Sequence, residues 1–264
     1  MSHPLDGCWA KIERANENIK NLEAEIAAFV QPDPYIIAGN VDHQTKECTF
    51  VAHAKAIPLR FSVLAGEIIH HLRSSLDHLI WALVLQRHTS PDFKVQFPIC
   101  LRAEEFEAAR KGGIINGISG SAQAIIERLQ PYRNADWRNT VHDNPLRIIH
   151  DLNNTDKHRL LAVVVSAVHI PGQIYFSGKM ADTAIAHFAP EQWGDELLRT
   201  EPDGTKFLTI RFSKMHSELQ VNADFRHQVA FEQFGTREIE PVIPSLMHLR
   251  DATIKAVRLF GGEF

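Results

Sequence analysis

The spacing of apolar residues predicts three long helices. A stripe in 3-4 spacing lies on a helix from about Leu5 to Val30, formed by Ile12, Ala15, Ile19, Leu22, Ile26 and Phe29. Fewer than three heptads are sustained and Pro32 and Pro34 stop the helix, so we expect a partner within the chain rather than a coiled coil. A second amphipathic helix over 240–260 can be that partner, through Val242, Leu246, Leu249, Thr253, Val257 and Phe260. The third runs from about Phe61 to Gln86.

Shorter elements lie between these helices. The run "PYIIAGNVDHQTKECTFVAHAKAI" predicts an antiparallel hairpin with a polar turn at Asp42 to Thr45. After the third helix we expect a loop with Pro91 and Pro98, then short helices near 103–111 and 121–129. Asn144 followed by Pro145 is typical of a helix start, and that helix includes all or part of "LRIIHDLNNTDKHRLL".

After Leu160 the sequence consists mainly of short runs of β-prone residues. Five runs predict strands: "LAVVVSAVHI", "QIYFSG", "TAIAHFA", "KFLTIRFS" and "HQVAFEQF". Because sequential strands are close together, we expect antiparallel pairing. The fold class is therefore α+β, a helical bundle segregated from an antiparallel β-sheet. We expect a single domain over 1–264, made of a helix and hairpin (5–58), a helical segment (60–160), a β-rich segment (161–234) and a C-terminal helix (240–260).

Composition excludes several classes of protein. Of 264 residues, 44% are hydrophobic and 23% charged, which is ordinary for a globular protein. The net charge is −4, whereas a protein that coats nucleic acid or an anionic membrane is strongly positive. Cys8, Cys48 and Cys100 are odd in number and scattered, so we expect reduced thiols. With no signal-like segment and no run long enough for a bilayer, we expect a cytoplasmic protein without a membrane partner.

The stretch "IIHHLRSSLDHLIWAL", residues 68–83, places titratable groups in a helix that otherwise looks buried. Five apolar residues fall within one sector of roughly 80° around the helix axis: Ile69, Leu72, Leu76, Leu79 and Leu83. The opposite side carries His70, Arg73, Ser74, Asp77, His78 and Trp81. Arg73 and Asp77 are four residues apart and can form an ion pair on the helix surface.

A second polar segment is "HDLNNTDKHRLL", residues 150–161. Its Asn-Asn-Thr-Asp run favours caps and turns, so we expect the helix to break or restart there, and a solvated turn is an equally good interpretation. If the two helices are neighbours, Lys157, His158 or Arg159 can meet Asp77, His78 or Arg73. Acids, bases and cations would then share one pocket.

Histidine spacing does not favour a metal site on one helix. Two ligands from a single helix normally lie three or four residues apart, whereas His78 is seven residues from His71 and eight from His70. A site assembled between helices with His150 or His158 stays open. We expect no resident metal and no cofactor.

Four stretches together resemble a widespread group of uncharacterised bacterial proteins. They are the residue 68–83 helix, "FPI" at 97–99, "LQPY" at 129–132 and "LNNTDKHRLL" at 152–161, and members of the group share a "HNLRSALDHL"-like helix and a later "DKHR". This resemblance implies no particular activity.

Arg73 and His78, with four residues between them, are also similar to the arginine and histidine signature of HEPN domains. These are helical bundles that often act as metal-independent ribonucleases. The resemblance implies that Arg73 neutralises the scissile phosphate of an RNA while His78 transfers a proton as the 2′-hydroxyl attacks. It also implies a homodimer, because such sites are usually composite.

Three hypotheses follow. In the first, the protein binds a ligand or partner, and Arg73, Asp77, His78 and the 156–159 run form a buried polar network. In the second it is an RNA-cleaving enzyme; in the third, a metal-dependent enzyme with a site between helices. The candidate catalytic residues are Arg73, Asp77, His78 and His158, and the candidate substrate-binding residues are His71, Ser74, Lys157 and Arg159.

Overall fold

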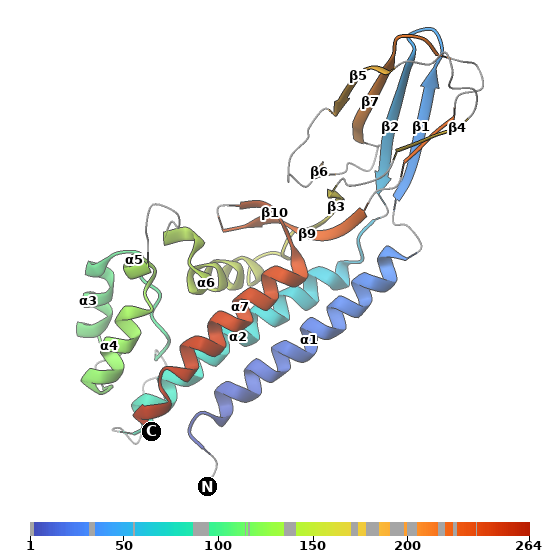
Figure 1. Cartoon of the computed structure of the whole chain (residues 1–264). Coiled ribbons are helices and arrows are strands. Elements are labelled where there is room, and N and C mark those ends of the chain that lie inside the picture. Colours follow the sequence, from blue (N-terminus) through green and yellow to red (C-terminus); the bar gives the residue numbers. More distant parts are fainter. Residues whose placement is uncertain are drawn as a thin grey trace.

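Three long helices lie side by side and bury the largest part of the core. They are α1 (Asp6–Val30), α2 (Leu59–Leu85) and α7 (Val242–Arg258), and Figure 1 shows them roughly aligned. The stripe on α1 buries Ile12, Ala15, Ile19 and Leu22 against α2 and α7. The expectation of a partner within the chain is therefore confirmed. The two ends of the chain meet, since the rings of His3 and Phe264 lie 6.2 Å apart.

The computed structural model describes residues 3–31, 35–54, 56–86, 95–113, 115, 117–134, 141–169, 174–177, 185–190, 198–199, 205–215, 220–223, 226–235 and 237–264. Shorter helices follow α2: α3 (Ala103–Lys111), α4 (Gly120–Arg128), α5 (Pro131–Asn134), the short 3-10 helix η1 (Val141–Asp143) and α6 (Pro145–Asp156). The predicted start of α6 is confirmed, because the Asn144 side chain accepts a hydrogen bond from the Leu146 amide. A second 3-10 helix, η2 (Gly261–Glu263), follows α7. Part of the predicted loop, around Pro91, lies outside the described residues.

The strands pair antiparallel throughout the described chain. They are β1 (Tyr35–Asp42), β2 (Glu47–Ala54), β3 (Val163–His169), β4 (Ile174–Ser177), β5 (Ile185–Pro190), β6 (Leu198–Arg199), β7 (Thr205–Phe212), β8 (Gln220–Ala223), β9 (Arg226–Phe234) and β10 (Arg237–Pro241). The orders are β1-β2-β7-β5, β10-β9-β3-β6 and β4-β8. The α+β class is confirmed.

The predicted hairpin forms, and its partner comes from far along the chain. Asp42 Oδ1 accepts hydrogen bonds from the amides of Gln44 and Thr45 in the turn, at 2.8 and 3.3 Å. β2 then pairs with β7, where an ion pair joins Arg211 to Glu47 at 2.7 Å. In Figure 1 this sheet lies beyond one end of the long helices, while β3, β9 and β10 lie next to them.

Two further expectations are tested by the fold. Cys8, Cys48 and Cys100 are free and buried, and burial raises the pKa of each thiol to about 11. Within the described residues, no helix combines the length and apolar character needed to cross a membrane.

Candidate polar network and cavity

Arg73 is tied to a neighbouring chain segment as well as to its own helix. Its Nη2 donates to Asp77 Oδ1 and to the carbonyl oxygen of Phe97, both at 2.8 Å. The Phe97 amide in turn donates to Asp77 Oδ1 at 2.9 Å. Arg73 is 6% exposed, and burial lowers its pKa, against the effect of Asp77. Burial also raises the pKa of Asp77, and the charge of Arg73 only partly offsets this.

Gln130 holds the same segment from its other side. Its Oε1 accepts from the Cys100 amide at 2.9 Å, and its Nε2 donates to the carbonyl of Pro98 at 3.1 Å and to that of Ile126 at 2.9 Å. Gln130 is fully buried. The backbone from Phe97 to Cys100 is therefore fixed by side chains from α2 and from the turn between α4 and α5, a substitute for the pairing that a strand would provide.

Helix α6 lies against the Arg73 side of α2. A Cβ added at Gly66 would lie 2.2 Å from Asp156 Oδ1, so the absence of a side chain at Gly66 lets the carboxylate approach. The charge of Lys157 reaches Asp77, since it lowers the pKa of that carboxyl. Burial lowers the pKa of His150, and the Arg73 charge lowers it further. The two polar segments thus face each other, but His78 and residues 157–159 are exposed and do not form the buried network of the first hypothesis.

The helix ends within the residue 150–161 segment, as expected, but only after the Asn-Asn-Thr-Asp run, because α6 continues to Asp156. Asn153 is buried, and the side chain of Asn154 hydrogen-bonds His150 Nε2 at 2.9 Å. These side chains find partners across one helical turn and in the packing, which outweighs their low helix propensity.

Asp156 gives a pH-dependent prediction. Burial raises its pKa above the ordinary 3.8, and it is the last residue of α6, where the helix dipole disfavours an anion. The charged form therefore destabilises the fold above the folded-state pKa, and the effect vanishes below 3.8, where the carboxyl is protonated in both states. We expect Asp156→Asn to raise the free energy of unfolding at pH 7 by about 0.3–1 kcal/mol.

Urea unfolding between pH 7 and pH 4 measures this effect, and the gain should shrink as the pH falls. Glu13→Gln, at an exposed position on α1, is the matched control and should show no such trend. A variant that is less stable than the native chain at pH 7 would contradict the assignment.

His71 and His78 on α2 face α1, whereas the charge of His70 reaches Asp156 of α6 and lowers the pKa of that carboxyl. A Cβ added at Gly7 would lie 2.8 Å from His78 Nδ1, which places this exposed ring against the start of α1. His71 lies near Lys11 and Arg14, whose charges add to burial in lowering its pKa. Arg73 and His78 are thus on different sides of α2 and do not meet in the described chain.

The remaining predicted site residues are also dispersed. His158 is exposed in the turn after α6, and Ser74 is half-buried on α2. Among the residues that the structure describes, no group of three or more His, Cys, Asp or Glu side chains is arranged to hold a metal ion. Two buried nitrogens in the same part of the chain, Arg73 Nη1 and His71 Nδ1, have no hydrogen-bond partner.

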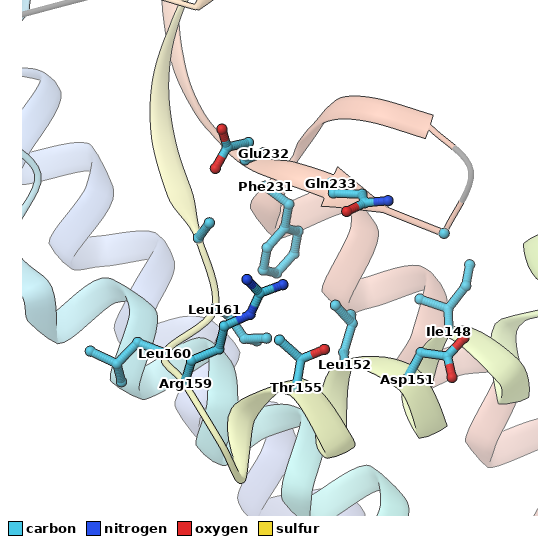
Figure 2. Close-up of a pocket in the computed structure, with 12 residues that line it drawn as sticks. Ile148, Asp151, Leu152, Thr155, Arg159, Leu160, Leu161, Phe231, Glu232 and Gln233 are labelled. Carbon is cyan, nitrogen blue, oxygen red and sulfur yellow. The ribbon is translucent and has the colours of Figure 1, made fainter.

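A cavity of about 450 Å³ opens on the other face of α6, between this helix and β9 (Figure 2). Its polar wall consists of Asp151, Thr155, Arg159, Glu232 and Gln233. Its apolar wall consists of Ile148, Leu152, Leu160, Leu161, Ala162 and Phe231. Positions 148, 151, 152 and 155 of α6 recur at 3-4 spacing, so they share one helix face.

Arg159 points into this cavity from a well-anchored backbone. Its amide donates to the Thr155 carbonyl at 2.9 Å, which extends the end of α6. Three residues later the Ala162 carbonyl accepts from the Glu232 amide at 3.0 Å, where the chain enters β3. Figure 2 shows the guanidinium between the Phe231 ring and Thr155.

Sequence reasoning missed three contributors to these sites. Phe97 acts through its backbone, which no side-chain pattern reveals. Gln130 lies in the "LQPY" stretch, and a glutamine next to a proline signals no particular contact. Phe231 comes from a strand about seventy positions after α6, so only the register of β3 with β9 brings it to the cavity. Comparisons of the chain with models of protein families, with curated proteins and with solved structures found no match.

Proposed function

We propose that the chain is a ligand-binding protein in which the Arg73 network is structural and the ligand occupies the cavity between α6 and β9. The observation that carries the proposal is that the two faces of α6 have different neighbours. One face, with His150 and Asp156, packs against α2 within reach of the Arg73 charge, and the other face forms a wall of the cavity.

Burial of Arg73 supports a structural role. Its guanidinium is almost fully covered and already bonded to Asp77 and to the Phe97 carbonyl. A group that binds a substrate phosphate has to be reached by it, and would have to exchange these partners at a cost. The cavity, by contrast, is open and falls in the size range of small-molecule sites.

The RNA-cleaving alternative draws less support from the same geometry. Arg73 faces α6 and the residue 97–100 segment, whereas His78 faces the start of α1. A homodimer and an RNA partner stay predictions, as does the resemblance to the bacterial group. A ribonuclease assay in EDTA separates the two functions, because only the alternative expects cleavage that His78→Ala abolishes.

Binding in the cavity can be tested with three probes that share one ring system but differ in charge: indole-3-acetate, indole-3-acetamide and tryptamine. We expect saturation-transfer NMR on the full chain to detect at least one of them. Gln233 is exposed at the cavity, so Gln233→Trp should obstruct it and remove the signal. Gln31→Trp, at an exposed site after α1, should keep the signal. Absence of binding by all three, or binding that survives Gln233→Trp, would overturn the proposal.

A further inference from the structure

We infer that the ligand of this cavity is a small organic monoanion, a carboxylate carried on an apolar body, and that Arg159 binds the carboxylate. The inference rests on the proposed function and adds the chemical class of the ligand. It follows from the state of the guanidinium, the charges around it and the composition of the cavity wall.

The Arg159 guanidinium is available for a ligand. Within the described part of the chain, no side chain forms a hydrogen bond or ion pair with it. It is directed into the cavity while its backbone is held by the end of α6 (Figure 2). A guanidinium presents two parallel N–H groups that match the two oxygens of a carboxylate, and Thr155 places a hydroxyl on the adjacent wall.

The surrounding charges favour one negative charge on the ligand over two. Asp151 is paired with Arg147 at 2.6 Å, so it adds little net field at the cavity. Glu232 also lines the cavity, with its carboxylate turned away from the guanidinium in Figure 2. Arg159 is the one basic side chain among the described residues that line the cavity, so it compensates a monoanion, whereas the second charge of a phosphate dianion would have no counter-ion there.

The rest of the wall suits an apolar group. Leu152, Leu161 and Phe231 are buried and fix the inner surface, while Leu160 is 44% exposed at the end of the same run. An apolar body that enters next to Arg159 covers the exposed part of Leu160 and packs against the buried side chains behind it. The carboxylate then stays at the guanidinium, so charge sets the orientation and this contact adds to the affinity.

The three indole probes test this class directly. We expect indole-3-acetate to bind the full-length chain more tightly than indole-3-acetamide, and tryptamine to bind most weakly. Arg159→Gln should weaken indole-3-acetate by about ten- to a hundredfold, the range for loss of a charged hydrogen-bond pair. It should leave the affinity for indole-3-acetamide within about twofold of the native value. Arg159→Lys should restore part of the preference for the anion.

Arg258→Gln is the matched control, because Arg258 is an exposed arginine on α7 that does not line the cavity. Equal affinity of the acid and the amide, or an Arg159→Gln variant that still prefers the acid, overturns the inference. The proposed function survives that result if binding remains sensitive to Gln233→Trp. Loss of this sensitivity removes the proposed function itself, so the two failures are distinguishable. Circular dichroism of each variant confirms folding.

Discussion

Arg73→Ala is expected to lower the free energy of unfolding by about 3 kcal/mol at pH 7, the lower end of the range for breaking a buried ion pair. The substitution leaves Asp77 without its counter-ion and the Phe97 carbonyl without its donor. The lower end applies because the Asp77 side chain is 33% exposed, so water relieves part of the penalty. Guanidinium chloride unfolding, followed by far-UV circular dichroism, gives this free energy.

The matched control is Arg14→Ala. Arg14 also pairs with a carboxylate on its own helix, Glu17 at 3.0 Å, but both side chains are more than half exposed. Such surface pairs contribute little, so we expect a loss below about 0.5 kcal/mol. Equal losses for the two variants would mean that burial of Arg73 has no structural consequence. The loss in free energy of unfolding for Arg73→Lys should fall between these two values, because a lysine keeps the positive charge but lacks the planar guanidinium group.

Gln130→Met is expected to cost about 2–4 kcal/mol, although it keeps the volume of the side chain. Two backbone groups, the Cys100 amide and the Pro98 carbonyl, lose their partners, whereas the Ile126 carbonyl keeps the Leu129 amide. Each unsatisfied buried group costs about 1–3 kcal/mol, and local relaxation keeps the sum below two full penalties. The same unfolding experiment measures it.

Gln123→Met controls for the loss of an amide side chain. Gln123 donates to the carbonyls of Ile115 and Ile118 but is only half-buried, so we expect about 1 kcal/mol. Arg73 and Gln130 hold the same segment, so the double variant Arg73→Ala with Gln130→Met should lose less than the two single losses combined. Strict additivity would indicate that the residue 97–100 segment does not couple them.

The long helices could be predicted because their apolar stripes are long and regular. The α1 stripe and the Asn144-Pro145 start of α6 are local signals, and both elements form as predicted. β6, β8 and β10 are short, so their residues carry little periodic signal. The pairing of β2 with β7 joins residues about 160 positions apart, which one sequence does not encode locally.

The candidate site was likewise predictable only where its signals are local in the sequence. The Arg73 to Asp77 pair follows from spacing, and the approach of the two polar segments follows from the two-helix hypothesis. The predicted site residues of these segments nevertheless lie apart, because they point in different directions around their helix axes. His78 is five residues after Arg73, about 140° further around the axis, so it meets α1 rather than α6. Arg159, in the turn after α6, lines the cavity between the other face of that helix and β9.

Three of the stretches that suggested a family resemblance are joined physically. Arg73 and Asp77 on α2 bond to Phe97 of "FPI", and Gln130 of "LQPY" bonds to Pro98 and Cys100. These contacts give the three stretches of this chain one shared structural role, because side chains from two of them hold the backbone of the third. This structural role requires no catalytic role for Arg73.

Arginine side-chain NMR tests the central claim, which assigns structure to Arg73 and ligand binding to Arg159. The Nε–H signals of both residues can be followed in one titration of the full chain with indole-3-acetate. We predict that the Arg159 signal shifts with saturation and that the Arg73 signal keeps its position. A shift confined to Arg73 would contradict the account, because it would place the ligand at the network on α2.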